Sequence, residues 1–343
     1  MKKVSKISKR KEEHLEICLE KDIESSVSAG FERIDIIHQA LPEIDFTKID
    51  ISTSFLGKYL NAPLLISSMT GGSPNGEKFN AILAEMAEHH QIAMGLGSQR
   101  AAIEDESLSA SFKVRKYAPN IFLFANLGAV QLNYGYGLNE IQRAIDMIEA
   151  DALFLHLNPL QEALQPEGNT NFSGLLPKIE ALCKQIETPV FIKEVGCGIN
   201  ANLAKTLIDV GVAGIDCAGL GGTSWALVEA ERQTDKDLKD FAKSFGNWGI
   251  PTVDCLLDYQ KNKIECPIIA SGGLRSGLDV FKSLALGANL AGMALPFIKA
   301  ANAGSDALHQ LIERIMLELK ISMFNTGCHN ISDISFSKID VKE

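Results

Sequence analysis

The sequence predicts an α/β protein built as a single (β/α)8 barrel, the TIM-barrel architecture. Short apolar runs typical of buried strands alternate along the chain with amphipathic helical patterns, which favours a parallel sheet. Eight such units close into a barrel more readily than they fill an open sheet. Glycine-rich segments occur at the ends of the last two runs, at 271–275 and 290–294. Because glycine lets the backbone approach a phosphate closely, these segments predict a phosphate site at the carboxyl end of the barrel.

The elements follow in a regular order. The expected strands span residues 64–68, 92–94, 121–124, 153–157, 190–193, 214–216, 267–270 and 290–293. Helical patterns occupy residues 76–89, 139–149, 175–185, 201–210 and 278–285, and a terminal helix is expected over 308–323.

No boundary for a second domain is evident, so residues 1–343 are expected to form a single domain. Residues 1–60 precede the first strand as an N-terminal extension, and residues 217–266 form a long insertion after strand six. The insertion contains the charged segment 229–237. Long inserts on this side of a barrel often form lids, so we expect this one to lie near the active site.

Composition excludes several classes of function. The 343 residues carry a formal net charge of −10, which argues against nucleic acid as a partner. We find neither a secretory signal nor an apolar run long enough to span a bilayer, so we expect a cytoplasmic protein without a membrane partner. The seven cysteines are scattered and include no C-x-x-C pair, so we expect reduced thiols and no zinc site.

Polar or glycine-rich residues follow the predicted strands at the face where barrel active sites lie. They are Ser68-Met69-Thr70-Gly71-Gly72, Gly97-Ser98-Gln99-Arg100, Asn126, His156-Leu157-Asn158 with Gln161-Glu162, Lys193-Glu194, and Gly221-Gly222-Thr223-Ser224-Trp225.

Together these motifs resemble the type 2 isopentenyl diphosphate isomerases, which are FMN enzymes of isoprenoid synthesis. The resemblance runs from about Arg10 to Met323, with its motifs in the order of that family. Besides the strand ends, it includes Arg10-Lys11-Glu12-Glu13-His14, Pro166-Glu167-Gly168, Lys193-Glu194-Val195-Gly196, Trp248-Gly249-Ile250 and Ser271-Gly272-Gly273. Two positions depart from the family pattern, Asn169 in place of aspartate and Asn200 in place of serine.

The resemblance implies which residues hold the flavin. A cation such as Lys193 on a barrel strand must be paired or used, and beside the flavin it would stabilise the negative charge of the reduced ring. The alternative is a lysine paired with Glu194 or another carboxylate. The residues expected to bind FMN are Ser68, Met69, Thr70, Ser98, Asn126, Lys193, Thr223, Gly272, Gly273, Leu274, Arg275, Ala294 and Leu295.

The resemblance also implies a reaction, the interconversion of isopentenyl and dimethylallyl diphosphate by proton addition and elimination. It implies FMN kept reduced by NADPH, and Mg²⁺ held by Glu162. Gln161 is the expected catalytic residue, near the carbon that loses a proton. We also expect a homo-oligomer. The residues expected to bind substrate are Arg10, Lys11, His14, Ser98, Gln99, Arg100, His156, Asn158 and Gln161.

Other interpretations remain open. The run Lys9-Arg10-Lys11 would also suit a solvated tail, and His156 would suit an ordinary core position. An FMN oxidase of 2-hydroxy acids shares the barrel and the flavin site, but it needs a histidine base at a late strand end, and none follows strands six and seven. A non-catalytic phosphate-binding barrel would have no use for Gln161 and Glu162 beside His156.

Overall fold

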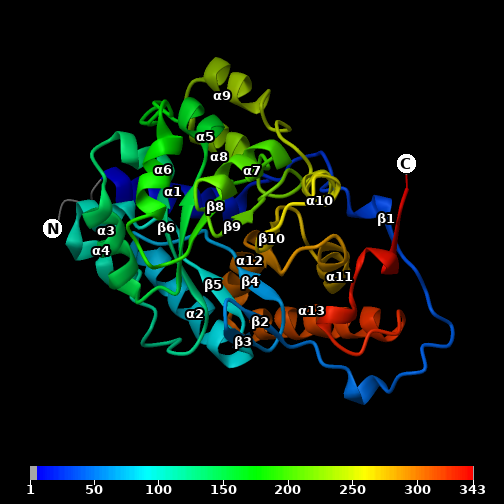
Figure 1. The fold of residues 1–343 in the computed structure, drawn as a ribbon. Helices are drawn as coiled ribbons and strands as arrows, with labels where there is room; N and C mark the ends of the chain where they lie inside the picture. Colours follow the sequence, from blue (N-terminus) through cyan, green and yellow to red (C-terminus); the bar gives the residue numbers. More distant parts are fainter. Residues whose placement is uncertain (1–5, 343) are drawn as a thin grey trace.

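A closed barrel of eight parallel strands forms the centre of the computed structural model, which describes residues 6–342 (Figure 1). Each strand pairs with the next one in sequence, and the last pairs with the first to close the ring. The predicted fold class is therefore confirmed, with the predicted strand ends shifted by a few residues. The strands are β4 (Leu64–Ile66), β5 (Ala93–Gly95), β6 (Leu123–Gly128), β7 (Ala152–His156), β8 (Val190–Lys193), β9 (Gly214–Asp216), β10 (Ile268–Ser271) and β11 (Leu290–Met293).

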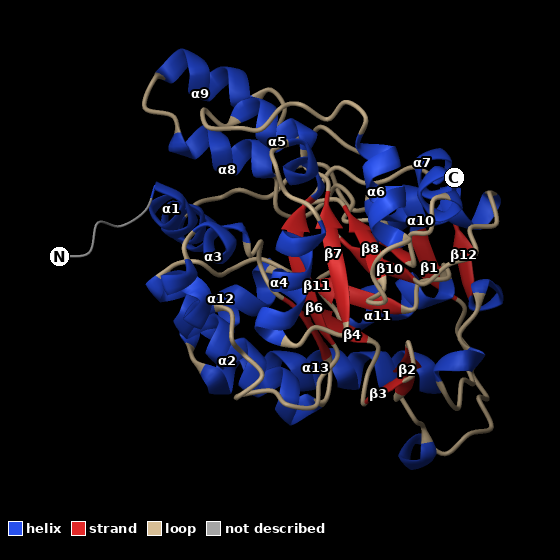
Figure 2. Ribbon diagram, turned by 60° about the vertical axis from the view of Figure 1, so that its left-hand side comes forward, coloured by secondary structure: helices blue, strands red, loops and turns tan. Residues whose placement is uncertain are grey.

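Helices surround the barrel (Figure 2). The predicted helices are all present, as α2 (Pro74–His90), α4 (Leu138–Ile148), α6 (Leu175–Cys183), α7 (Ala201–Asp209), α11 (Gly277–Ala285) and α13 (Ser305–Phe324). Sequence analysis did not delimit the others, which are α1 (Lys6–Glu20), α3 (Arg100–Glu104), α5 (Pro159–Leu164), α8 (Trp225–Arg232), α9 (Lys236–Lys243), α10 (Thr252–Lys261) and α12 (Leu295–Ala303). Within residues 6–342, no helix is both long enough and apolar enough to cross a bilayer.

Aromatic side chains fill the interior of the barrel. Phe124 and Phe154 stack with their ring centroids 4.1 Å apart, and Phe191 packs edge-on against both rings. A hairpin of β2 (Thr53–Phe55) and β3 (Lys58–Leu60) adds Phe55 and Leu60 to this cluster. The hairpin therefore covers the amino end of the barrel interior with apolar side chains.

The N-terminal extension wraps around the barrel and returns to it. Helix α1 packs against α2, α8 and α12, which brings its side chains to the carboxyl end of the strands. Strand β1 (Ile34–Ile36) pairs antiparallel with β12 (Ile339–Val341), which ties the extension to the C-terminal tail. Distant parts of the chain therefore meet at the mouth of the barrel.

The predicted insertion folds into helices α8, α9 and α10. In Figure 2, α8 and α9 lie beside α5 at the end toward which the strand arrows point. Helix α10 packs against α7 and β10 and so belongs to the outer ring of helices. Thus α8 and α9 are the part of the insertion that extends over the carboxyl end of the barrel.

Strand register aligns polar residues at this end. His156 pairs with Lys193, and Lys193 pairs with Asp216, on three successive strands. Asn126 was expected to follow its strand but lies within β6, because the apolar run continues through Leu127 to Gly128. Paired residues of neighbouring parallel strands point to the same side of the sheet, so these side chains are adjacent.

Candidate active site

A cavity opens at the carboxyl ends of the strands and contains nearly all of the predicted site residues. It encloses about 1270 Å³ of empty space, including solvent at its mouth. Residues of α1, α5 and α8 line it together with the strand ends. The predicted residues on its wall are Arg10, Lys11, His14, Ser68, Met69, Ser98, Arg100, Asn126, His156, Asn158, Gln161, Glu162, Lys193, Thr223, Gly272, Gly273, Leu274, Arg275, Ala294 and Leu295.

Two predicted residues do not line this cavity. Gln99 was expected to bind substrate, but its side chain is fully buried, donating to the Ala144 carbonyl at 2.7 Å and accepting from the Asn126 backbone N–H at 3.0 Å. Thr70 is buried behind the wall, and its carbonyl accepts a hydrogen bond from the Gly97 N–H. Both residues therefore lie behind the wall and support it from within the protein.

The glycines after β10 allow two loops to approach each other closely. Gly272 and Gly273 have positive φ angles of +101° and +81°. A Cβ atom on Gly272 would lie 2.1 Å from the Gly219 carbonyl oxygen, and one on Gly273 would lie 2.5 Å from that of Gly221. Only glycine fits such positions, so the backbone itself forms this part of the wall and can hold a phosphate.

Arg275 lines the same region, but its guanidinium is already engaged. It donates to Glu24 Oε2 at 2.7 Å and to the Leu274 carbonyl at 2.8 Å. Glu24 belongs to the N-terminal extension, so this ion pair could not be predicted from the sequence. A phosphate here would therefore meet backbone N–H groups first and would compete with Glu24 for the guanidinium.

Buried hydroxyl groups without partners line the floor of the cavity. In the described part of the chain, Ser67 Oγ and Ser68 Oγ are buried and make no hydrogen bond. Buried polar groups are nearly always paired in native proteins, so these two hydroxyls are available to a polar ligand. With the glycine-lined loops, they fit a flavin that carries a phosphate tail.

Lys193 is paired across the floor with a carboxylate. Its Nζ lies 3.2 Å from Asp216 Oδ2, and both side chains are buried. Asp216 also accepts a hydrogen bond from Ser271 Oγ at 2.6 Å. Glu194, the partner considered from sequence, instead accepts hydrogen bonds from the backbone N–H groups of 195–197. Lys193 is thus both paired and in position to meet a ligand.

His156 is held as a neutral imidazole. Burial lowers the pKa of His156 to about 3, and the positive charges of Lys11 and Lys193 add to this shift. Asn126 Nδ2 donates to the Leu96 carbonyl, so its Oδ1 is the acceptor facing His156 Nδ1 at 2.7 Å. The ring proton therefore lies on Nδ1, and Nε2 carries a lone pair. His156 would have to gain a proton before Nε2 could donate to a diphosphate.

Three cations, Arg10, Lys11 and Arg100, lie on the cavity wall, and we call this part of the cavity the cationic wall. Burial lowers the pKa of Lys11 to about 7, and the charges of Arg10 and Arg100 lower it further. Burial likewise lowers the pKa of Arg10. Within residues 6–342, the Lys11 ammonium has no carboxylate at ion-pair distance, whereas Arg100 binds Glu104 at 2.7 Å. Clustered cations that depress one another's pKa values form a site for an anion.

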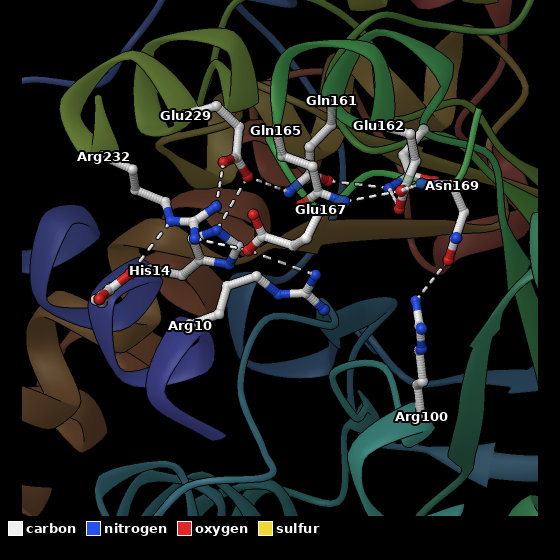
Figure 3. A network of polar contacts seen from close by, with 12 residues as sticks. Arg10, His14, Arg100, Gln161, Glu162, Gln165, Glu167, Asn169, Glu229 and Arg232 are labelled. Atoms are coloured by element: carbon white, nitrogen blue, oxygen red, sulfur yellow. Dashed lines mark hydrogen bonds and ion pairs between the residues drawn. The ribbon is translucent and has the colours of Figure 1, made fainter. Parts of the chain in front are cut away.

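Gln161 is fixed at both ends of its amide (Figure 3). Its Nε2 donates to Glu229 Oε1 at 3.0 Å, and its Oε1 accepts from Asn158 Nδ2 at 3.1 Å. Glu229 is fully buried and also contacts His14 Nε2 at 3.0 Å and Arg232 Nη1 at 2.6 Å. Burial alone would raise the pKa of Glu229, but these partners hold it at about 2, so it is ionised at pH 7.

Three N–H donors hold the Glu162 carboxylate in place. Its carboxylate accepts from Asn158 Nδ2 at 3.1 Å, from Gln165 Nε2 at 2.7 Å and from the Asn169 N–H at 2.5 Å. Asn158 Oδ1 is buried without a partner in the described part of the chain. One carboxylate and one amide oxygen beside the cationic wall fit Mg²⁺, which keeps water and substrate phosphate as its other ligands.

Sequence reasoning missed several residues of this network. Glu229 and Arg232 lie three residues apart on α8, a spacing typical of a solvent-exposed ion pair. Gln131 and Gln165 also line the cavity, and Gln131 donates to Asn169 Oδ1 at 3.1 Å. Asn169 accepts from Arg100 as well, at 2.7 Å, so this departure from the family pattern still supports the cationic wall. Asn200, the other departure, caps α7 away from the cavity.

Comparison with known proteins identifies the family of this chain. Residues 162–341 match the model of the family described as FMN-dependent dehydrogenase. A curated isopentenyl-diphosphate delta-isomerase of Nostoc sp. is 50% identical over 329 residues, covering 96% of this chain and 94% of that protein. The corresponding protein of Rickettsia bellii is 48% identical over 331 residues, with 96% of each chain covered.

Solved structures with similar folds are more distant in sequence. A flavocytochrome b2 mutant superposes with a TM-score of 0.67 at 18% identity, covering 96% of this chain and 82% of that chain. An active mutant of (S)-mandelate dehydrogenase superposes with a TM-score of 0.68 at 16% identity, covering 98% and 99%. At these identities the likeness shows the barrel fold alone.

The histidines of the cavity separate this chain from oxidases of 2-hydroxy acids. Within residues 6–342, the cavity is lined by His14 of α1 and His156 of β7, and no histidine comes from the ends of β9, β10 or β11. A half-identical match over nearly the whole chain outweighs the shared barrel of the dehydrogenases. The chain therefore belongs to the type 2, FMN-dependent isopentenyl-diphosphate delta-isomerases.

Proposed function

We propose that this protein interconverts isopentenyl and dimethylallyl diphosphate by adding a proton to one carbon and removing one from another. The observation that carries the proposal is the Gln161 amide, fixed between Asn158 and Glu229 beside a cationic wall. An amide in this position suits an uncharged alkene, while the cations suit a diphosphate. Reduced FMN, when bound, supplies acid–base chemistry and negative charge, with NADPH serving only to reduce it.

The cationic wall anchors the diphosphate. Arg10, Lys11 and Arg100 give charge-assisted hydrogen bonds, and Glu162 with Asn158 Oδ1 would supply oxygen ligands to Mg²⁺. The positive charges of this wall attract the anion. Once bound, the anion relieves part of the mutual repulsion between the cations that lowers the pKa of Lys11. Binding the diphosphate here leaves the hydrocarbon end directed toward the floor formed by Ser68 and Lys193.

Gln161 orients the reacting carbons and does not act as a strong base. A neutral amide is a weak proton acceptor, and both of its ends are already hydrogen-bonded. Glu229 fixes the amide through Nε2, and its own charge is balanced by Arg232. A side chain held in this way positions the substrate at little entropic cost during the reaction.

Lys193 acts on the charge at the floor of the cavity. The ammonium is buried beside Asp216, so its field is weakly screened by water. A cation in this position stabilises negative charge on a ligand that lies against β8. Lys193 therefore stabilises negative charge on the flavin ring without taking part in proton transfer itself.

Isotope exchange tests the reaction directly. With FMN reduced and Mg²⁺ present in deuterated water, we expect deuterium in the product and many more turnovers than the reductant supplied. Gln161→Ala should retain FMN but lose most of the exchange, since it removes the orienting amide. Arg100→Ala should chiefly raise KM, and the exposed Gln142→Ala should match the native protein.

Oxidoreductase activity would contradict the proposal. Steady oxidation of NADPH in one-to-one ratio with product would show that electrons are consumed in each cycle. Turnover of 2-hydroxy acids with release of peroxide would favour an FMN oxidase of 2-hydroxy acids instead. Full exchange by Gln161→Ala would leave the isomerase assignment intact but remove the proposed role of that amide.

A further inference from the structure

Three histidines meet on the outside of the barrel. His89 and His90 end helix α2, and His309 lies near the start of α13. One nitrogen from each ring lies within 4.8 Å of the others. His90 Nε2 is 3.0 Å from His309 Nδ1, and His90 Nδ1 is 3.3 Å from Glu313 Oε1. His90 is buried, His309 is half-buried and His89 is exposed.

This cluster is remote from the cavity. Helix α2 follows β4 and runs back along the barrel, so its last residues lie at the amino end of the strands, opposite the active site. Figures 1 and 2 both show α2 and α13 next to each other on the side of the molecule away from α5, α8 and α9. None of the three histidines lines the cavity, and the isomerase reaction has no use for them.

The contacts of His90 with Glu313 and His309 indicate which nitrogens have lone pairs. Glu313 is an acceptor, so a neutral His90 places its proton on Nδ1 and directs the Nε2 lone pair toward His309. His309 Nδ1 then carries a proton shared with that lone pair. If this proton moves to His309 Nε2, both facing nitrogens become ligands without any net loss of protons. A carboxylate behind a histidine is the arrangement that orients metal ligands in proteins.

From this arrangement we propose that His89, His90 and His309 bind one Zn²⁺-class ion, with Glu313 as the carboxylate that orients His90. In a tetrahedral zinc site, nitrogens with bonds of about 2.0–2.1 Å lie about 3.3 Å apart. The pair His90–His309 needs to open by only a few tenths of an ångström to reach this value. His89 is exposed and can rotate to supply the third nitrogen, and water completes the coordination.

The chemistry separates this site from the predicted Mg²⁺ site. Imidazole ligands suit zinc, nickel and copper, whereas Mg²⁺ takes oxygen ligands such as Glu162. The expectation of no zinc site rested on cysteine spacing. The proposed ligands are histidines instead, and His90 and His309 lie 219 residues apart in the sequence. The ion would link α2, the first helix after β4, to α13, the last long helix. It would therefore stabilise the junction where β4 and β11 pair to close the barrel.

Zinc binding to the untagged holoenzyme, with FMN bound and Mg²⁺ in excess, tests the proposal. We expect one equivalent of Zn²⁺ per chain and a rise in Tm that a zinc-selective chelator reverses. Co²⁺ should bind competitively with Zn²⁺ and give the visible absorption of a tetrahedral nitrogen site, without the thiolate charge-transfer band that a cysteine site would show.

Variants outside the catalytic machinery locate the ion. Glu313→Ala should weaken zinc binding by roughly ten- to hundredfold, because the orienting carboxylate is lost. His309→Ala removes a ligand and should weaken binding further, and His89→Ala gives a second, exposed position where folding is not at risk. His38→Ala, an exposed histidine elsewhere in the extension, is the matched control and should bind zinc like the native protein.

Several results would overturn the proposal. They are the absence of stoichiometric zinc from the native holoenzyme, unchanged zinc affinity in both His309→Ala and His89→Ala, and a thiolate band in the Co²⁺ spectrum. The isomerase assay is not part of this test, so failure of the zinc site would leave the proposed function untouched.

Discussion

Gln161 Nε2 donates a hydrogen bond to Glu229 Oε1 at 3.0 Å, linking α5 to α8 across the mouth of the barrel. Glu229 is fully buried, and its other contacts come from His14 of the N-terminal extension and Arg232 of its own helix. The Gln161 amide is therefore oriented by an ionised carboxylate that two segments outside the barrel hold in place.

Glu229→Gln is expected to leave the Gln161 amide without its orienting carboxylate. An amide at position 229 would leave Arg232 and His14 without their anion, and breaking a buried ion pair costs about 3 kcal/mol of unfolding free energy. We expect kcat for isomerisation to fall by about tenfold or more with little change in FMN affinity, measured by deuterium incorporation and flavin titration. Glu231→Gln, on the same helix but paired at the surface with Lys239, should change neither quantity. A native kcat in Glu229→Gln would show that Gln161 needs no orientation from α8.

Lys193→Met is expected to lower the reduction potential of the bound flavin. The variant removes the cation from the floor and leaves Asp216 buried without a partner, so negative charge on a reduced ring meets a second negative charge. Potentiometric titration of the native and variant proteins measures the shift. The double variant Lys193→Met/Asp216→Asn removes both charges and should recover part of the potential. Identical potentials in all three proteins would limit Lys193 to a structural role.

Glu162→Gln is expected to raise the Mg²⁺ concentration needed for half-maximal activity while FMN binding stays native. The amide lacks the charge of the carboxylate and turns an N–H₂ group toward donors such as Gln165 and the Asn169 N–H. Activity measured against Mg²⁺ concentration gives the shift, and the exposed Glu187→Gln serves as control. Superimposable Mg²⁺ curves for both variants would place the metal elsewhere.

Diphosphate binding is expected to weaken as pH rises through 7. Burial lowers the pKa of Lys11 to about 7, so its ammonium is charged below that pH and neutral above it. The charged form binds an anion better, so binding near pH 7 to 8 should take up a fraction of a proton. Calorimetry of inorganic pyrophosphate binding in buffers of different ionisation enthalpy measures this uptake.

Lys11→Arg provides the comparison for that experiment. Arginine stays charged over the whole range, and titration of pyrophosphate itself contributes equally to both proteins. The native protein should lose affinity more steeply than the variant between pH 6 and 8, and its extra proton uptake should disappear in the variant. Equal pH profiles would show that Lys11 is fully charged before the anion binds.

Local patterns in the sequence determined the barrel and much of its mouth. Parallel strands buried on both faces read as continuous apolar runs, so β4 to β11 were recognisable one at a time. Gly272 and Gly273 predicted a close approach of the backbone, and in the structure the carbonyl groups of Gly219 and Gly221 lie directly against them. The residues at the strand ends then fell on one face, because barrel topology gathers all carboxyl ends together.

Only the tertiary structure decided the pairings. The sequence allowed a carboxylate partner for Lys193, but strand register selected Asp216 and turned Glu194 toward backbone N–H groups. Gln99 stood beside Arg100 in a site motif, yet it points into the wall.

Long-range contacts were equally invisible in the sequence. Sequence alone placed Glu229 in a charged segment of the insertion, but its contacts with His14 and Gln161 follow from the packing of α1 and α5 against α8. His309 carried no signal linking it to His89 and His90. Periodicity indicates which face of an element is buried, whereas the identity of a partner far away in the sequence depends on packing between elements. That is why the strands and glycine loops followed from sequence, and the charge network and the histidine cluster did not.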